Sequence, residues 1–212
     1  MKPWRTYQAY FILYVLSLVW WSPNLYGANA PLQVTRMGMT SWAQRRDIGV
    51  VKQQFDYSCG ASALATLMSL YGRQTAEKEV LGKLLKDKES SFQNLAEAAQ
   101  SFGFRAKGLA VGLAQLKKLK LPVILYFHHK RNDHFTVFTG WDQGRFQVAD
   151  PTWGNLVLDE STFKEKWFTR DDESFVGRIL VLIPNPGQQV SAPVTTLPSP
   201  RLALRAFLRS RP

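Results

Sequence analysis

The hydrophobic pattern of this 212-residue chain changes its period near Pro122, and this change constrains the fold more than any other feature. Before Pro122, apolar side chains mostly recur at helical spacing, whereas after it the apolar runs are short or alternate with polar residues. Helices followed by strands predict an α+β fold, with N-terminal helices packed on a mostly antiparallel sheet. The expected helices span 59–71, 75–86, 91–102, 113–119 and 162–167, and the expected strands span 104–110, 122–128, 134–141, 145–150, 155–159 and 176–183.

Polar residues at the starts of these helices indicate where each one begins. Thr75 and Ser91 are expected to cap the second and third helices. Thr162 and Glu165 have the spacing of a capping box for a helix that ends at Trp167. The first helix is expected to turn one apolar face inward, made of Ala63, Leu64, Leu67, Met68 and Tyr71.

Composition divides the chain into three parts. An apolar content of 45% supports a hydrophobic core, and we expect residues 31–184 to form one domain around it. Residues 185–212 are rich in Pro, Ser and Arg and are expected to be a disordered basic tail, with a short amphipathic helix on a membrane surface as the alternative. The net charge of +11 is shared with both ends of the chain, so the domain between them does not predict a nucleic-acid partner.

Residues 1–30 resemble an export signal. Lys2 and Arg5 precede an apolar run over residues 9–21, and Ala28-Asn29-Ala30 has the small-residue pattern of a cleavage site. The run is bulky and Pro31 would follow the cut, so a cleaved signal peptide and an uncleaved membrane anchor through residues 9–21 both stay open. In either case we expect the domain to be exported, to the periplasm or the medium.

Cys59 is the only cysteine, so it cannot form an intrachain disulfide. It stands at the start of the first expected helix, where the positive end of the helix dipole favours a thiolate. A free thiol in an exported protein is consistent with a nucleophile. A buried, inert cysteine is the alternative.

His134 and Asp150 mark the two ends of an expected hairpin. His134 opens one strand, Asp150 closes the next, and the turn Asp142-Gln143-Gly144 joins them, so we expect the two side chains to lie close together. This arrangement suits a base and the carboxylate that orients it. A solvent-facing histidine and an ordinary Asp-Pro turn are the alternatives.

The histidines also allow a metal site as a weaker alternative. His128, His129 and His134 are close in sequence, and Cys59 could join them. The chain lacks a second cysteine, a His-x-x-x-His pair and the usual zinc spacings, so we expect neither a metal nor another cofactor.

Three separated blocks carry a family resemblance. They are Gln53-x5-Cys59-Gly60-x-Ser62-x-Leu64, then Asp133-His134-Phe135-Thr136-Val137, then Val148-Ala149-Asp150-Pro151. In this order they resemble the bacteriocin-processing peptidases, papain-like cysteine peptidases that cut after a double-glycine leader. The resemblance covers roughly residues 45–184 and implies a papain-like fold and a peptide or protein substrate.

The resemblance implies a role for each matched residue. Cys59 would attack a peptide carbonyl, His134 would carry the proton, and Asp150 would orient His134. Gln53, six residues before the cysteine, would stabilise the oxyanion together with the Cys59 backbone N–H.

The chain also departs from many members of that family, which are N-terminal domains of peptide-exporting ABC transporters. It shows no ATP-binding glycine loop and no bundle of membrane helices, and it carries an apparent export signal. We therefore expect a stand-alone, exported cysteine peptidase, whose substrate need not be a double-glycine leader. A non-catalytic peptide-binding module and an amide-forming transferase of the same fold are the alternatives, and no feature indicates an oligomeric state.

Overall fold

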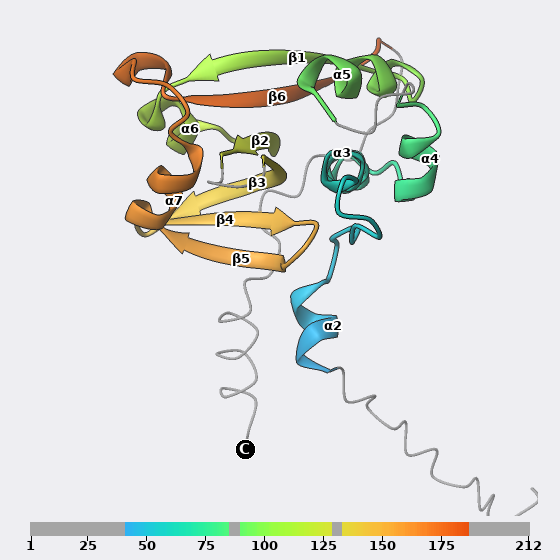
Figure 1. Ribbon diagram of the computed structural model, residues 1–212, viewed down its shortest axis with the longest axis horizontal. Coiled ribbons are helices and arrows are strands. Elements are labelled where there is room, and N and C mark those ends of the chain that lie inside the picture. The colour runs from blue at the N-terminus through green and yellow to red at the C-terminus, as the bar shows by residue number, and fades with distance from the viewer. Residues whose placement is uncertain (1–40, 85–89, 129–132, 187–212) are drawn as a thin grey trace, which may run out of the picture. The chain divides into compact units, whose positions relative to one another are not determined.

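The computed structural model describes residues 41–84, 90–128 and 133–186 (Figure 1). The segment expected to be a signal or anchor, His129, and all but the first two residues of the expected C-terminal tail lie outside this part of the chain. Within it, no helix is long and apolar enough to cross a membrane. The helices are α2 (Trp42–Arg46), α3 (Cys59–Leu70), α4 (Glu77–Leu81), α5 (Phe92–Gln100), α6 (Leu113–Lys118), α7 (Glu160–Trp167) and the 3-10 turn η1 (Glu173–Phe175).

The strands form one six-stranded antiparallel sheet with the order β1-β6-β2-β3-β4-β5. They are β1 (Phe104–Val111), β2 (Val123–Phe127), β3 (His134–Asp142), β4 (Arg145–Asp150), β5 (Gly154–Asp159) and β6 (Gly177–Pro184). Gln143 and Gly144 both have positive φ, 47° and 78°, which suits the tight turn of the β3–β4 hairpin. The expected α+β fold is confirmed, and β6, the last strand, lies between β1 and β2 (Figure 1).

Apolar residues alternate along the strands, so the sheet has a hydrophobic cluster on each face. On β2, Ile124 belongs to the cluster that includes α3, α4 and α5, whereas Leu125 belongs to the cluster that includes α6 and α7. On β3, Phe135 and Val137 face the first cluster and Phe138 the second, as the sequence pattern predicts. Figure 1 shows the two helix groups at opposite ends of the view.

Helix α3 is more deeply buried than its sequence pattern predicts. The expected inward residues are buried, but so are Gly60, Ser62 and Thr66 on the other sides of the helix. Small residues let the helix approach its neighbours on several sides, with β3 on one side and α4 and α5 on others. Helix α3, which begins at Cys59, is therefore packed closely against the sheet.

Two expected helix starts are wrong. The second helix is the short α4, and its N-cap is Ala76, because the Thr75 hydroxyl donates to the Arg73 carbonyl instead. Helix α7 is capped by Asp159, whose carboxylate accepts from the Thr162 N–H, so Thr162 lies inside the helix. Ser91 caps α5 as expected. Helix α2 and the turn η1 were not expected from the pattern.

The segment before α3 is hydrogen-bonded to the start of β5 and to the turn that precedes it. The Asn155 side-chain amide donates to the carbonyls of Arg46, at 2.9 Å, and Ile48, at 2.8 Å. Farther along, the Gln53 N–H donates to the Pro151 carbonyl at 3.1 Å. These bonds hold the approach to Cys59 beside the residues that follow Asp150.

Candidate active site

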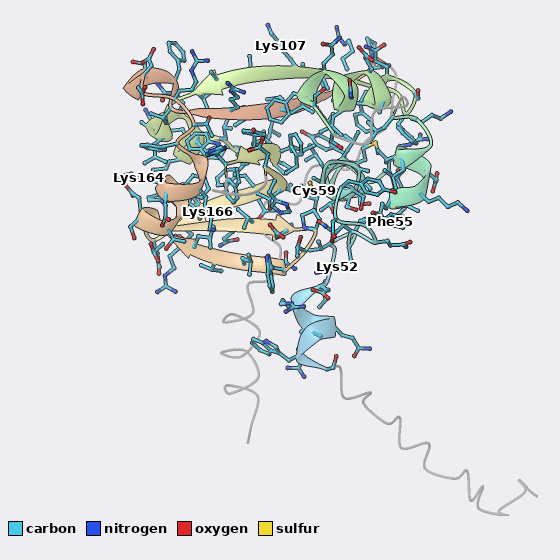
Figure 2. All side chains as sticks on the ribbon, viewed as in Figure 1. Lys52, Phe55, Cys59, Lys107, Lys164 and Lys166 are labelled. Atoms are coloured by element: carbon cyan, nitrogen blue, oxygen red, sulfur yellow. The ribbon has the colours of Figure 1, made fainter. Side chains whose placement is uncertain are left out.

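Cys59 is the first residue of α3 and lies where that helix meets the sheet (Figure 2). The residue before it, Ser58, is the N-cap, yet its side chain does not cap the helix. The Ser58 hydroxyl donates to the Phe55 carbonyl at 2.7 Å and accepts from the Phe55 N–H at 3.1 Å. The N–H groups of the first helical turn are thus left without a side-chain cap, and the Gly60 N–H is free to bond the Cys59 sulfur.

His134 and Asp150 are in direct contact. His134 Nε2 lies 2.8 Å from Asp150 Oδ2, and the Asp150 side chain is only 4% exposed. The other carboxylate oxygen, Oδ1, accepts from the backbone N–H groups of Thr152 and Trp153 at 2.8 and 3.0 Å. The carboxylate is therefore fully engaged and fixes the plane of the His134 ring.

His134 is also coupled to the Cys59 thiol, because each of the two groups shifts the pKa of the other. Since Nε2 is directed at Asp150, the remaining ring nitrogen, Nδ1, is the atom available to Cys59. The Phe135 backbone N–H bonds the same sulfur. Cys59 is 8% exposed, so its sulfur is mostly shielded from water yet borders a cleft.

The electrostatics of the site favour a charged pair made of Cys59 and His134. Burial opposes a thiolate, but the hydrogen bond from His134, the Phe135 N–H and the His134 charge together lower the pKa of Cys59 below its ordinary value. Burial also opposes a charged imidazole, but the bonds to Asp150 and Cys59 raise the pKa of His134 to about 9. A thiolate beside an imidazolium is the form these shifts favour near neutral pH.

Asp150 stays ionised in this setting. Burial would raise its pKa, but the His134 hydrogen bond and charge, with the two backbone N–H groups, lower the pKa below its ordinary value. A buried carboxylate that remains charged supports the imidazolium form of His134.

Gln53 lies in the loop that leads into α3, six residues before Cys59. Its amide nitrogen donates to the Phe55 carbonyl at 3.1 Å, and its amide oxygen accepts from the Thr152 hydroxyl at 2.9 Å. Among the described residues, Gln53 has no hydrogen bond to Cys59 or His134. The structure thus brings Cys59, His134 and Asp150 into contact and holds Gln53 at their margin.

A hollow of about 700 Å³ opens beside Cys59. Aromatic rings of Phe92, Tyr126 and Phe135 contact one another in it, with ring centroids 5.5 to 6.4 Å apart. Its lining mixes these rings with hydroxyl and charged side chains: Asp56, Tyr57, Cys59, Ser90, Ser91, Phe92, Tyr126, Asp133, Phe135 and Arg178. A second hollow of about 690 Å³ has Tyr126 and Arg178 in its lining as well.

His128 belongs to a different cluster from His134. Its Nδ1 lies 2.9 Å from Asp133 Oδ1, and the same carboxylate accepts from the Tyr126 hydroxyl. Burial and this bond raise the pKa of Tyr126 to about 12. In the described part of the chain, no three metal-binding side chains gather, because His128 and His134 are engaged by separate carboxylates.

Sequence reasoning missed most of the surroundings of these residues. Thr152 and the cleft residues Tyr126 and Arg178 were not singled out. Tyr126 and Arg178 are neighbours only because β6 pairs with β2, which no local pattern indicates. The one available signal for Thr152 was its position directly after the third matched block, two residues beyond Asp150.

Comparisons with known proteins agree on one family. The model of the Peptidase C39 family matches residues 47–170. A protein named probable functional amyloid protease FapD, from Pseudomonas aeruginosa, is 28% identical over 178 residues, covering 80% of this chain and 75% of that protein. Its namesake from Pseudomonas fluorescens is 29% identical over 133 residues, covering 58% of this chain and 59% of that protein.

Solved structures show the same likeness. A double-glycine motif protease from an AMS/PCAT transporter, solved in complex with its leader peptide, is 27% identical with a TM-score of 0.53, covering 64% of this chain and 91% of that one. The peptidase domain of Streptococcus ComA, a bifunctional ABC transporter, has a TM-score of 0.55 at 20% identity, covering 64% of this chain and 98% of that one. The second likeness shows a shared fold.

Proposed function

The chain belongs to the peptidase C39 family and is a cysteine peptidase of papain-like α+β fold; from that premise we propose that it cleaves polypeptides through Cys59, His134 and Asp150. The observation that carries the proposal is the 2.8 Å contact between Asp150 and His134, together with the coupling of His134 to the Cys59 thiol at the edge of a cleft. This order of acid, imidazole and thiol is what acyl transfer to sulfur needs.

The proposed reaction has two halves. The Cys59 thiolate attacks the carbonyl carbon of a peptide bond, and the His134 imidazolium gives its proton to the amine that leaves. The C–N bond breaks and a thioester to Cys59 remains. Water then attacks the thioester while His134 takes a proton from the water. This step releases the acid product and restores the Cys59 thiolate and the His134 imidazolium.

An oxyanion forms in both halves and needs donors. The backbone N–H groups at the uncapped start of α3 supply positive potential there, and the Gln53 amide is the side-chain donor we propose. One of its two N–H bonds is used by the Phe55 carbonyl, which leaves the other for the substrate. Loss of one such donor typically slows the reaction by about 10²–10³-fold.

The proposed substrate is an exported polypeptide that enters the cleft in extended form. The hollow of about 700 Å³ beside Cys59 offers room for residues on one side of the cut. One relative is named a probable functional amyloid protease, and a solved double-glycine motif protease is in complex with its leader peptide. We propose the amyloid type of substrate first, because that likeness covers the larger share of this chain.

The proposed location is outside the cytoplasm. Lys2, Arg5 and the apolar run over residues 9–21 support export, either with cleavage near Ala30 or with the run kept as an anchor. Cell fractionation of the full chain, with a Lys2→Glu/Arg5→Glu variant as control, tests this. Retention of the wild-type chain in the cytoplasm would refute it.

The test of activity uses two purified probes, the amyloid polypeptide of the Pseudomonas aeruginosa relative and a synthetic double-glycine leader peptide. The wild-type chain should cleave at least the first, whereas Cys59→Ala should cleave neither and keep the wild-type circular dichroism spectrum. Cleavage of the leader peptide alone would replace the proposed substrate class. Equal cleavage by Cys59→Ala would refute the catalytic assignment.

A further inference from the structure

We propose that Thr152 is a positioning residue, whose hydroxyl orients the Gln53 amide so that its free N–H serves the oxyanion. The inference rests on the proposed function, in which Gln53 is an oxyanion donor. It starts from one contact between distant parts of the chain, the hydrogen bond of 2.9 Å from Thr152 Oγ1 to Gln53 Oε1.

The contacts at the two ends of the Gln53 amide fix which way it faces. A hydroxyl donates to its oxygen at one end, and a carbonyl, that of Phe55, accepts from its nitrogen at the other. A flipped amide would bring its oxygen against the Phe55 carbonyl oxygen, where neither atom can donate. The Thr152 hydroxyl therefore stabilises the orientation of the Gln53 amide that keeps one N–H available. Without this hydroxyl, only the hydrogen bond to the Phe55 carbonyl restrains the amide.

The backbone of Thr152 is already committed to the Asp150 side of the site. Its N–H donates to Asp150 Oδ1 at 2.8 Å, and its carbonyl accepts from Lys52 Nζ at 2.6 Å. One residue thus touches the carboxylate that orients His134 through its main chain and the proposed oxyanion donor through its side chain. The turn after Asp150 therefore positions both the carboxylate that orients His134 and the proposed oxyanion donor Gln53.

This division makes the side chain testable by itself. Thr152 is exposed, so Thr152→Val removes the hydroxyl without opening a cavity, and every backbone contact of the turn can persist. Thr152→Ser keeps the hydroxyl and is the matched control. Of the two variants, only Thr152→Ser keeps the hydroxyl that makes the hydrogen bond at issue.

The readout compares two reagents that both meet the Cys59 sulfur. p-Nitrophenyl acetate acylates it through an oxyanion, followed as the burst of p-nitrophenolate, whereas iodoacetamide alkylates it without forming one. Thr152→Val should slow acylation roughly two- to tenfold, the worth of one neutral hydrogen bond, and leave alkylation unchanged. Thr152→Ser should acylate like the wild type.

A Gln53→Ala background separates this inference from the proposed function. There Thr152→Val should cause no further loss, because the amide that it orients is gone. If Gln53→Ala slows acylation but Thr152→Val does not, or if the loss persists in the Gln53→Ala background, the role of Thr152 is refuted alone. If Gln53→Ala acylates at the wild-type rate, the proposed oxyanion role of Gln53 fails and this inference fails with it.

Discussion

His134 Nε2 lies 2.8 Å from Asp150 Oδ2, although the two residues are sixteen positions apart in the chain. The register of the β3–β4 hairpin explains this distance. Val137 faces Ala149, so the pairing continued by one residue sets Asp150 opposite Thr136, and His134 lies two residues farther along β3 on the same side of the sheet. The imidazole and the carboxylate meet because they are diagonal neighbours on one face.

The charge of Asp150 is predicted to set the pKa of His134 separately from its orientation. Asp150→Asn keeps an oxygen that can accept from Nε2 but removes the negative charge, so the pKa of His134 should fall from about 9. The alkaline limb of the kcat/KM profile should then move to lower pH. An unchanged limb in Asp150→Asn would show that the carboxylate charge does not reach His134.

Removal of the whole Asp150 side chain is predicted to remove the orientation of His134 as well as the charge beside it. Asp150→Ala loses the acceptor for Nε2 and leaves the backbone N–H groups of Thr152 and Trp153 without their partner. We expect kcat/KM to fall by about 10⁴-fold, the loss typical when a triad carboxylate is disabled. Activity of Asp150→Ala within twofold of the wild type would contradict this, provided that both proteins melt at similar temperatures.

The activity of the wild-type chain is predicted to fall on both sides of neutral pH. Above about 9 the His134 imidazolium loses the proton that the leaving amine requires. At low pH the Cys59 thiolate is protonated, but this limb should lie below the ordinary range of a thiol, because the pKa of Cys59 is lowered. A kcat/KM profile that rises through pH 8.5 like a free thiol, at about its usual pKa, would contradict the ion pair.

A prediction about stability concerns Gly177, at the start of β6. A Cβ atom at this position would strike the buried indole ring of Trp167, so Gly177→Ala should destabilise the fold by about 1–3 kcal/mol through overpacking. Gly144 is the matched control, since an added Cβ there meets nothing within 4 Å and only its φ of +78° resists the change. Thermal melts of both variants check this, and a melting temperature for Gly177→Ala at or above that of Gly144→Ala would contradict it.

The sequence predicted the elements that have a strong hydrophobic period. Leu95, Ala98 and Ala99 are buried on α5 as the helical spacing indicates, and Phe135 and Phe138 point to opposite faces of the sheet. These positions follow from the local geometry of helices and strands, so no knowledge of the distant chain is needed.

Where the sequence did not predict a helix start, nearby groups compete for the capping hydrogen bonds. Asp159 and Thr162 are both good capping residues three positions apart, and the carboxylate of Asp159 captures the Thr162 N–H. Thr75 likewise has a nearby carbonyl, that of Arg73, as a competing partner for its hydroxyl. Such choices depend on where the preceding strand or loop delivers the chain.

The candidate site could be predicted only in part, for a related reason. The motifs pointed to Cys59, His134 and Asp150, whose proximity follows from one helix start and one hairpin. The bond between Thr152 and Gln53 joins residues ninety-nine positions apart and depends on how the β4–β5 turn lies against the approach to α3. No period or spacing encodes that docking.

The reactivity of Cys59 toward iodoacetamide at about pH 6 tests the central claim most directly, because an ordinary thiol with a pKa of about 8.5 is only about 0.3% thiolate there. Wild-type Cys59 should be alkylated at least about tenfold faster than Cys59 in His134→Ala, whose sulfur lacks the imidazolium partner. Both rates are read by mass spectrometry of the intact chain, with circular dichroism as the check of folding. Equal, slow alkylation of the two proteins would contradict a thiol activated by His134.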